Sequence, residues 1–131
     1  MPDDTSSIGM EVRRQVLGDA YVDASLEGAD DFMMTFQTLV SEQVWGRAWA
    51  GTVLDRKTKC ILTLGILAAL GRFQEVGIYV AGALRCGVTV DENKDALVHV
   101  TAYFGEPAGR QAFIAAHDAL LAAGALGPPQ G

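Results

Sequence analysis

The sequence has few of the residues that define several common protein classes. It has two cysteines, Cys60 and Cys86, which lie far apart without C-x-x-C spacing, so we expect small buried apolar residues rather than a disulfide framework. Its 10 Lys and Arg against 16 Asp and Glu give a net charge of -6, which argues against a nucleic-acid partner. The two histidines lack H-x-x-x-H spacing, so no metal site is predicted.

Long hydrophobic runs are also missing. The longest apolar stretch, residues 60–70, falls short of the roughly 20 residues that a membrane span needs. The N-terminus is polar and acidic and does not resemble a secretory signal. No nucleophile elbow, glycine-rich phosphate loop or dinucleotide fingerprint is found. We therefore expect a cytoplasmic protein with no membrane partner.

Hydrophobic residues, by contrast, make up half of the 131 residues. A chain of this length forms one domain, whose interior is too small to cover so much apolar surface. Part of that surface is therefore expected in contacts between subunits of a homo-oligomer.

Helical periodicity and helix-ending residues predict an all-α, single-domain bundle of about six helices over residues 1–131, with 1–9 and 124–131 as flexible tails. A short helix over 10–17 precedes a loop. A second helix follows Asp30 or Asp31, and a Trp-rich turn comes after it. The T-x-x-E pattern at Thr89 and Glu92 predicts a capping box. The remaining predicted helices cover residues 56–70, 72–86, 90–104 and 108–123.

The helix over 56–70 is apolar all round from Cys60 onward, which predicts burial on every side. Gly71 suits the position just past its end. This helix and the next one are expected to form a central helical hairpin.

One face of the helix over 72–86 carries the first candidate catalytic residues. Glu75, Tyr79, Gly82 and Cys86 recur at helical spacing and share that face. A carboxylate one turn from a phenol on a helix built for burial must be paired, neutral or lining a wet cavity. The alternatives are a core tyrosine and an ion pair between Glu75 and one of the nearby basic residues, namely Arg56, Lys57, Lys59 or Arg72.

A second candidate lies on the next helix, where His99 precedes Tyr103 by four residues. Imidazole is the side chain best suited to proton transfer near neutral pH. A lone histidine among apolar residues is also compatible with a satisfied core residue.

The segment Trp45-Gly46-Arg47-Ala48-Trp49 brings two indoles and a guanidinium within five residues. Such a set can form one wall of a pocket for a planar anion. The alternative is simple packing of two large aromatic side chains at a helix end.

Residues 71–105 resemble the signature segment of the carboxymuconolactone decarboxylase family. That segment carries a Glu, three residues, His-Val-Arg-x-Ala-Leu, Asn-Gly-Val-Thr and Tyr-x-Gly-x-Pro, and this chain matches the Glu, the Gly-Val-Thr and the Tyr-x-Gly-x-Pro. Residues 13–18 and 45–59 also resemble family patterns, so the likeness covers roughly residues 10–120. The resemblance implies an alkylhydroperoxidase D-like all-α fold, trimers or hexamers, no required cofactor, and a site between helices near a subunit boundary.

Several positions depart from the family pattern. Tyr79 stands where the family has His, Ala81 and Gly51 where it has Arg, and Cys86 where it has Asn. The thiol pattern C-x-x-C-x-x-x-H of the peroxidase branch is missing, which argues against peroxidase activity. Because two cationic contacts for a substrate carboxylate are replaced, the resemblance implies an inherited pocket with altered chemistry.

The sequence thus predicts a cofactor-free lyase or isomerase acting on a small apolar lactone, enol or polyketide-like substrate. Glu75 is the expected base or orienting group, Tyr79 a hydrogen-bond donor or acid, and His99 a second proton-handling group. The predicted substrate-binding residues are Trp45, Arg47, Trp49, Cys86 and Tyr103. Decarboxylation of a changed substrate and cyclase-type tailoring compete within this class, and the lost arginines favour the second. A true carboxymuconolactone-type decarboxylase and a non-catalytic binding or scaffold protein are the alternatives.

Overall fold

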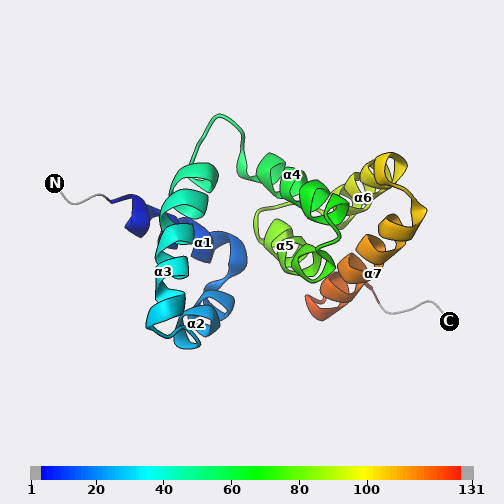
Figure 1. The fold of residues 1–131 in the computed structure, drawn as a ribbon. Coiled ribbons are helices and arrows are strands. Elements are labelled where there is room, and N and C mark those ends of the chain that lie inside the picture. The colour runs from blue at the N-terminus through cyan, green and yellow to red at the C-terminus, as the bar shows by residue number, and fades with distance from the viewer. Residues whose placement is uncertain (1–3, 128–131) are drawn as a thin grey trace. The chain divides into compact units, whose positions relative to one another are not determined.

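Helices are the only regular elements in residues 4–127, the part of the chain that the computed structural model describes (Figure 1). The all-α fold class is therefore confirmed. Backbone contacts divide the chain between Arg56 and Lys57 into two units, called here the N-terminal and the C-terminal unit. The elements in order are α1 Thr5–Leu17, α2 Asp19–Glu27, α3 Asp31–Leu39, the π-helical segment η1 Val40–Trp49, α4 Arg56–Ala69, α5 Phe73–Arg85, α6 Val90–Phe104 and α7 Glu106–Ala122.

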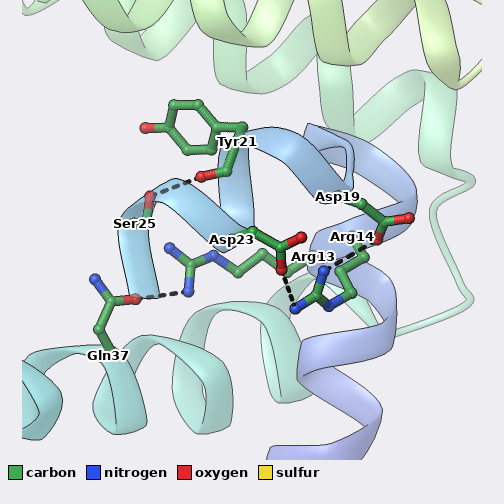
Figure 2. Close-up of polar contacts among 7 residues, drawn as sticks. All are labelled: Arg13, Arg14, Asp19, Tyr21, Asp23, Ser25 and Gln37. Atoms are coloured by element: carbon green, nitrogen blue, oxygen red, sulfur yellow. Dashed lines mark hydrogen bonds and ion pairs between the residues drawn. The ribbon is translucent and has the colours of Figure 1, made fainter. Parts of the chain in front are cut away.

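The N-terminal unit is more helical than its sequence predicts. Helix α1 begins at Thr5, so residues 5–9 of the expected flexible tail are helical, whereas residues 1–3 lie outside the described part. The loop expected after residue 17 is instead helix α2. Gly18, at φ 86°, separates the two helices, and Arg14 then joins them through ion pairs of 3.1 Å to Asp19 and 2.8 Å to Asp23 (Figure 2).

The segment expected to be a Trp-rich turn is the continuation of a helix. Asp30 caps α3 by accepting a hydrogen bond from the Met33 amide at 2.9 Å, which confirms the predicted start. The backbone then passes without a break into η1, which ends at Trp49. Its wider turn is a rare conformation in proteins.

Two glycines allow α1 to lie directly against η1. A Cβ atom at Gly9 would overlap the carbonyl oxygen of Ser41, and one at Gly46 would overlap that of Thr5. A buried hydrogen bond of 2.7 Å from Arg13 Nη1 to Gln37 Oε1 joins α1 to α3 beside this crossing (Figure 2). The unit is thus held by close backbone packing and by polar links between its helices.

The C-terminal unit matches its predicted helix boundaries to within two residues. Gly71, Gly87 and Gly124 all have positive φ, and each ends its helix in a Schellman motif. After Gly87, for example, the Val88 amide donates to the Ala83 carbonyl at 2.9 Å. The capping box of α6 is confirmed as well.

Helices α4 to α7 share one apolar core, built mainly from Leu64, Ala68, Val76, Val80, Leu97, Ala112, Ala116 and Leu120. Helices α4 and α5 join at Gly71, while the closest backbone packing of α5 is with α7. Burial of α4 on every side is not observed within this chain. One face is buried, whereas Leu62, Ile66 and Leu70 are 54%, 52% and 69% exposed. No helix within residues 4–127 is long and apolar enough to cross a membrane.

Candidate active site

Glu75 lies in the first turn of α5 and forms an ion pair with Arg72. The distance from Arg72 Nη2 to Glu75 Oε1 is 3.2 Å, and about a third of the Glu75 side chain is exposed. The structure therefore places Glu75 in the paired arrangement that the sequence left open. Because Arg72 is largely exposed, this pair contributes little to stability and leaves the carboxylate accessible.

Tyr79 lies one turn beyond Glu75 on α5 and is half-buried. Its ring packs against the apolar core of the C-terminal unit, to which Val100 and Phe104 of α6 also contribute. Cys86 is the residue that ends α5, and it is partly buried. The predicted α5 face thus combines an accessible carboxylate with a phenol held by apolar neighbours.

His99 and Tyr103 lie together on α6, with ring centroids 5.3 Å apart and planes tilted by 43°. Both side chains are exposed, so His99 is not the satisfied core residue of the alternative interpretation. They line a groove of about 500 Å³ with four apolar residues, Gly65, Ala69, Val100 and Phe104. A Cβ atom at Gly65 would lie 3.2 Å from Val100, so the small residue lets α4 approach α6 closely here.

This groove brings a predicted proton-handling residue and a predicted substrate-binding residue to one cavity. Its walls are apolar apart from the imidazole and the phenol. Such a cavity can hold a small apolar molecule beside a proton donor. Glu75 and Tyr79 are not among the residues that line it.

The aromatic cluster of the N-terminal unit is not assembled into one pocket. Trp45 and Trp49 stack with centroids 4.9 Å apart and are only 3% and 7% exposed. Arg47 is exposed and lines a separate, more polar cavity of about 140 Å³, which neither indole reaches. The structure thus shows the packing role for the tryptophans, and substrate binding by this cluster stays a prediction.

Sequence reasoning missed a second groove, of about 740 Å³, between α5 and α7. It is open and lined mainly by small or apolar side chains, with Arg85 and Asp118 among its polar residues. Gly77 and Ala81 on α5, together with Ala115 and Ala119 on α7, recur every four residues. That spacing is the signal in the sequence, but it becomes a groove only when the two helices are paired.

Within residues 4–127, no three His, Cys, Asp or Glu side chains gather closely enough to hold a metal ion.

Comparison with known proteins places these helices in a family. The model of the carboxymuconolactone decarboxylase family matches residues 34–118. A 4-carboxymuconolactone decarboxylase from Acinetobacter baylyi is 38% identical over 110 residues, which cover 84% of this chain and 82% of the relative. A nitrosuccinic acid decarboxylase from Metarhizium robertsii is 38% identical over 106 residues, covering 81% of this chain and 74% of that protein.

A third relative gives a shorter match. A 4-carboxymuconolactone decarboxylase from Pseudomonas putida is 50% identical over 38 residues, 29% of this chain and 79% of the relative. The family match covers well over half of the chain, and two relatives exceed 30% identity over most of it. The resemblance inferred from residues 71–105 is therefore confirmed, and the chain belongs to the carboxymuconolactone decarboxylase family.

Proposed function

We propose that this protein is a decarboxylase that releases carbon dioxide from a small carboxylic acid. The relatives support the reaction type, because two proteins matched over more than four-fifths of this chain are named as decarboxylases of different acids. Both acids place an electron-accepting lactone or nitro group near the carboxylate. The expected substrate therefore carries such a group, which accepts the electron pair of the broken carbon–carbon bond without a cofactor.

The single structural observation that carries the proposal is the groove shared by His99 and Tyr103. A carboxylate concentrates its negative charge, whereas the transition state for loss of carbon dioxide spreads that charge over the acceptor. Apolar walls such as Val100 and Phe104 offer little solvation to a localised charge and so favour this redistribution. His99 then donates a proton to the carbon left by carbon dioxide, and Tyr103 orients the substrate.

The α5 face offers the competing source of that proton. In this version Tyr79 donates the proton or a hydrogen bond, and Glu75 orients the substrate. A phenol is a weaker acid than imidazolium, so we assign the proton to His99 and keep Tyr79 as the alternative.

A second candidate function is a cofactor-free isomerase or cyclase acting on a neutral enol, lactone or polyketide-like substrate. It is favoured by Ala81 and Gly51, which stand where the family pattern has arginine. A neutral substrate needs no cationic partner, whereas a carboxylate gains from one.

We further propose that the protein works as a homo-oligomer. Large apolar side chains are exposed on or next to the two helices that carry the groove, namely Leu62 and Ile66 on α4, Leu70 directly after α4, and Val98 and Tyr103 on α6. Exposed apolar surface of this extent on neighbouring helices is typical of a subunit contact. Native mass spectrometry is expected to show an assembly of three or six chains, and a monomer at micromolar concentration would contradict this.

The catalytic assignment is tested by three variants assayed with 4-carboxymuconolactone and with nitrosuccinic acid. His99→Gln is expected to lower kcat by about 100-fold or more, because it removes general acid catalysis. Tyr79→Phe is expected to change kcat by less than about tenfold. His117→Gln is the matched control, since His117 is also an exposed histidine but lies on α7 outside the groove.

The three variants also decide between His99 and Tyr79 as the proton donor. A large loss in Tyr79→Phe with none in His99→Gln would move the proton donor to α5. Full activity in both variants would overturn the acid–base assignment altogether.

A further inference from the structure

The groove between α5 and α7 shares no lining residue with the groove at His99, and its shape suits a helical surface. Its volume is about 740 Å³, and on α5 it extends from Phe73 to Arg85, which is roughly 18 Å of helix at 1.5 Å per residue. It is open, whereas sites for small molecules enclose most of the surface of their ligand. An open groove of this length therefore fits another helix better than a small molecule.

The apolar part of this groove combines small residues with two isoleucines. The small residues recur every four positions on each helix, namely Gly77 and Ala81 on α5 and Ala115, Ala119 and Ala123 on α7. Ile78 and Ile114 line the same groove, and the Ile114 side chain is 51% exposed. Helices pack by placing the large side chains of one between the residues of the other. This face therefore carries both the projecting side chains and the spaces that receive them.

The described residues after α7 do not line this groove. Gly124, at φ 69°, turns the backbone, and Leu126 then packs against the core. There it lines a smaller cavity of about 130 Å³ between α6 and α7, whose wall includes the fully buried Asn93. Residues 124–127 are thus part of the packed unit rather than of the expected flexible tail, whose remaining residues, 128–131, lie outside the described part.

The polar side chains of the groove make the same face self-complementary. Arg85 of α5 and Asp118 of α7 are exposed and carry opposite charges, and Asp118 forms no ion pair within residues 4–127. Gln74 and Gln111 are exposed amides, each able to donate and accept hydrogen bonds. A contact around a twofold axis pairs each residue with its counterpart in both directions, so one surface must supply both members of every pair. The groove meets this requirement for charge, for hydrogen bonding and for shape.

We infer that the α5–α7 groove is the contact between two copies of this chain related by a twofold axis. The isoleucines of each copy, Ile78 and Ile114, pack among the small residues of the other, and Arg85 forms an ion pair with Asp118 of the partner subunit in both directions. A guanidinium has five N–H donors, so Arg85 can bind this carboxylate beside its contacts within the chain. Burial of the isoleucines supplies the apolar part of the contact, and the two ion pairs fix its register.

This contact is distinct from the subunit contact proposed above on α4 and α6, and it does not depend on the reaction. None of the residues that line the groove lies on α4 or α6. Because every twofold contact joins two copies, an assembly in which all of these faces are paired holds an even number of chains. The number of chains therefore separates the two proposals. Six chains agree with both contacts, three with the α4–α6 contact alone, and two with the α5–α7 contact alone.

Charge reversal tests the contact, with native mass spectrometry of the 131-residue chain to count the copies. The wild type is expected to hold an even number of chains. Arg85→Glu and Asp118→Arg are each expected to halve that number, because each variant places like charges opposite one another twice. The double variant restores opposite charges and is expected to regain the wild-type number. Arg110→Glu is the matched control, since Arg110 is an exposed cation on α7 that does not line the groove.

Circular dichroism checks that the variants fold. If Arg85→Glu does not fold, Ala122→Glu takes its place, because Ala122 is exposed, lines the groove and lies at the end of α7. An odd number of chains or a monomer in the wild type overturns the inference. An unchanged number in the single variants, a double variant that stays halved, or the same loss in Arg110→Glu overturns it as well.

Discussion

The two units of this chain pack their helices in different ways, and the difference separates structural from functional residues. In the N-terminal unit, α1 lies backbone to backbone on η1, and the stacked indoles of Trp45 and Trp49 fill the interior. In the C-terminal unit, smaller aliphatic side chains pack four helices and leave two large grooves and a smaller cavity. The stacked tryptophans thus support packing, and the two large grooves lie in the C-terminal unit. The N-terminal unit has a smaller, more polar cavity at Arg47.

The largest loss of stability is expected when Trp45, in the packed interior of the N-terminal unit, is replaced. Trp45→Ala is expected to lower the free energy of unfolding by about 3–5 kcal/mol, because it removes a buried ring and leaves a cavity. Urea unfolding measures the loss. Arg47→Ala, two residues away on the exposed surface, is the control and is expected to change stability by less than about 0.5 kcal/mol. Lower turnover by folded Arg47→Ala would restore this cluster to the substrate site.

The close crossing of α1 and η1 predicts the next largest effect. Gly9→Ala is expected to cost about 1–3 kcal/mol, because the added methyl group would overlap the Ser41 carbonyl oxygen and force the helices apart. Gly28→Ala is the control, since a Cβ atom there would meet nothing closer than 3.5 Å and φ is negative. Equal losses in the two variants would show that the crossing is not the cause.

In the C-terminal unit, the capping box at the start of α6 is expected to contribute a smaller amount of stability. The Glu92 amide donates to Thr89 Oγ1 at 3.0 Å, and the Thr89 amide donates to Glu92 Oε1 at 2.9 Å. Thr89→Ala is expected to lower the free energy of unfolding by about 1 kcal/mol. Thr38→Ala, an exposed threonine within α3 rather than at a helix start, should have a smaller effect. Thermal or urea unfolding compares the two variants.

The smallest expected effect is a dependence on pH. The Thr89 amide and, to a lesser degree, Lys57 Nζ at 3.0 Å hold the pKa of Glu92 below its usual value. A carboxyl whose pKa is lower in the folded state stabilises the fold above its unfolded pKa and loses that contribution as pH falls through the lowered pKa. Glu92→Gln should therefore show a shallower loss of stability in acid than the wild type. Parallel curves would contradict the role of this carboxylate.

The helix ends of the C-terminal unit could be predicted because their signals are local. Gly71 and Gly87 adopt the positive φ that glycine tolerates best, and the T-x-x-E pattern specifies its own hydrogen bonds. The extent of η1 could not be predicted in this way, because Gly46 of η1 packs against Gly9 of α1, which lies far away in sequence.

In the candidate site, too, only the contacts between residues close in sequence could be predicted. The pairing of His99 with Tyr103 follows from their spacing on one helix, and Glu75 pairs with Arg72 for the same reason. The burial of Asn93, by contrast, depends on the packing of α7 and on the return of Leu126 after Gly124. No local pattern in α6 distinguishes Asn93 from an exposed polar residue in a first turn.

The central claim is that the C-terminal unit decarboxylates a small acid, and one reaction in deuterated water tests it most directly. The protein is incubated with 4-carboxymuconolactone and, separately, with nitrosuccinic acid, and both carbon dioxide and the product are measured by mass spectrometry. The account predicts one carbon dioxide released and one carbon-bound deuteron gained for each substrate molecule consumed. Consumption of substrate without release of carbon dioxide would contradict it and would favour the isomerase or cyclase.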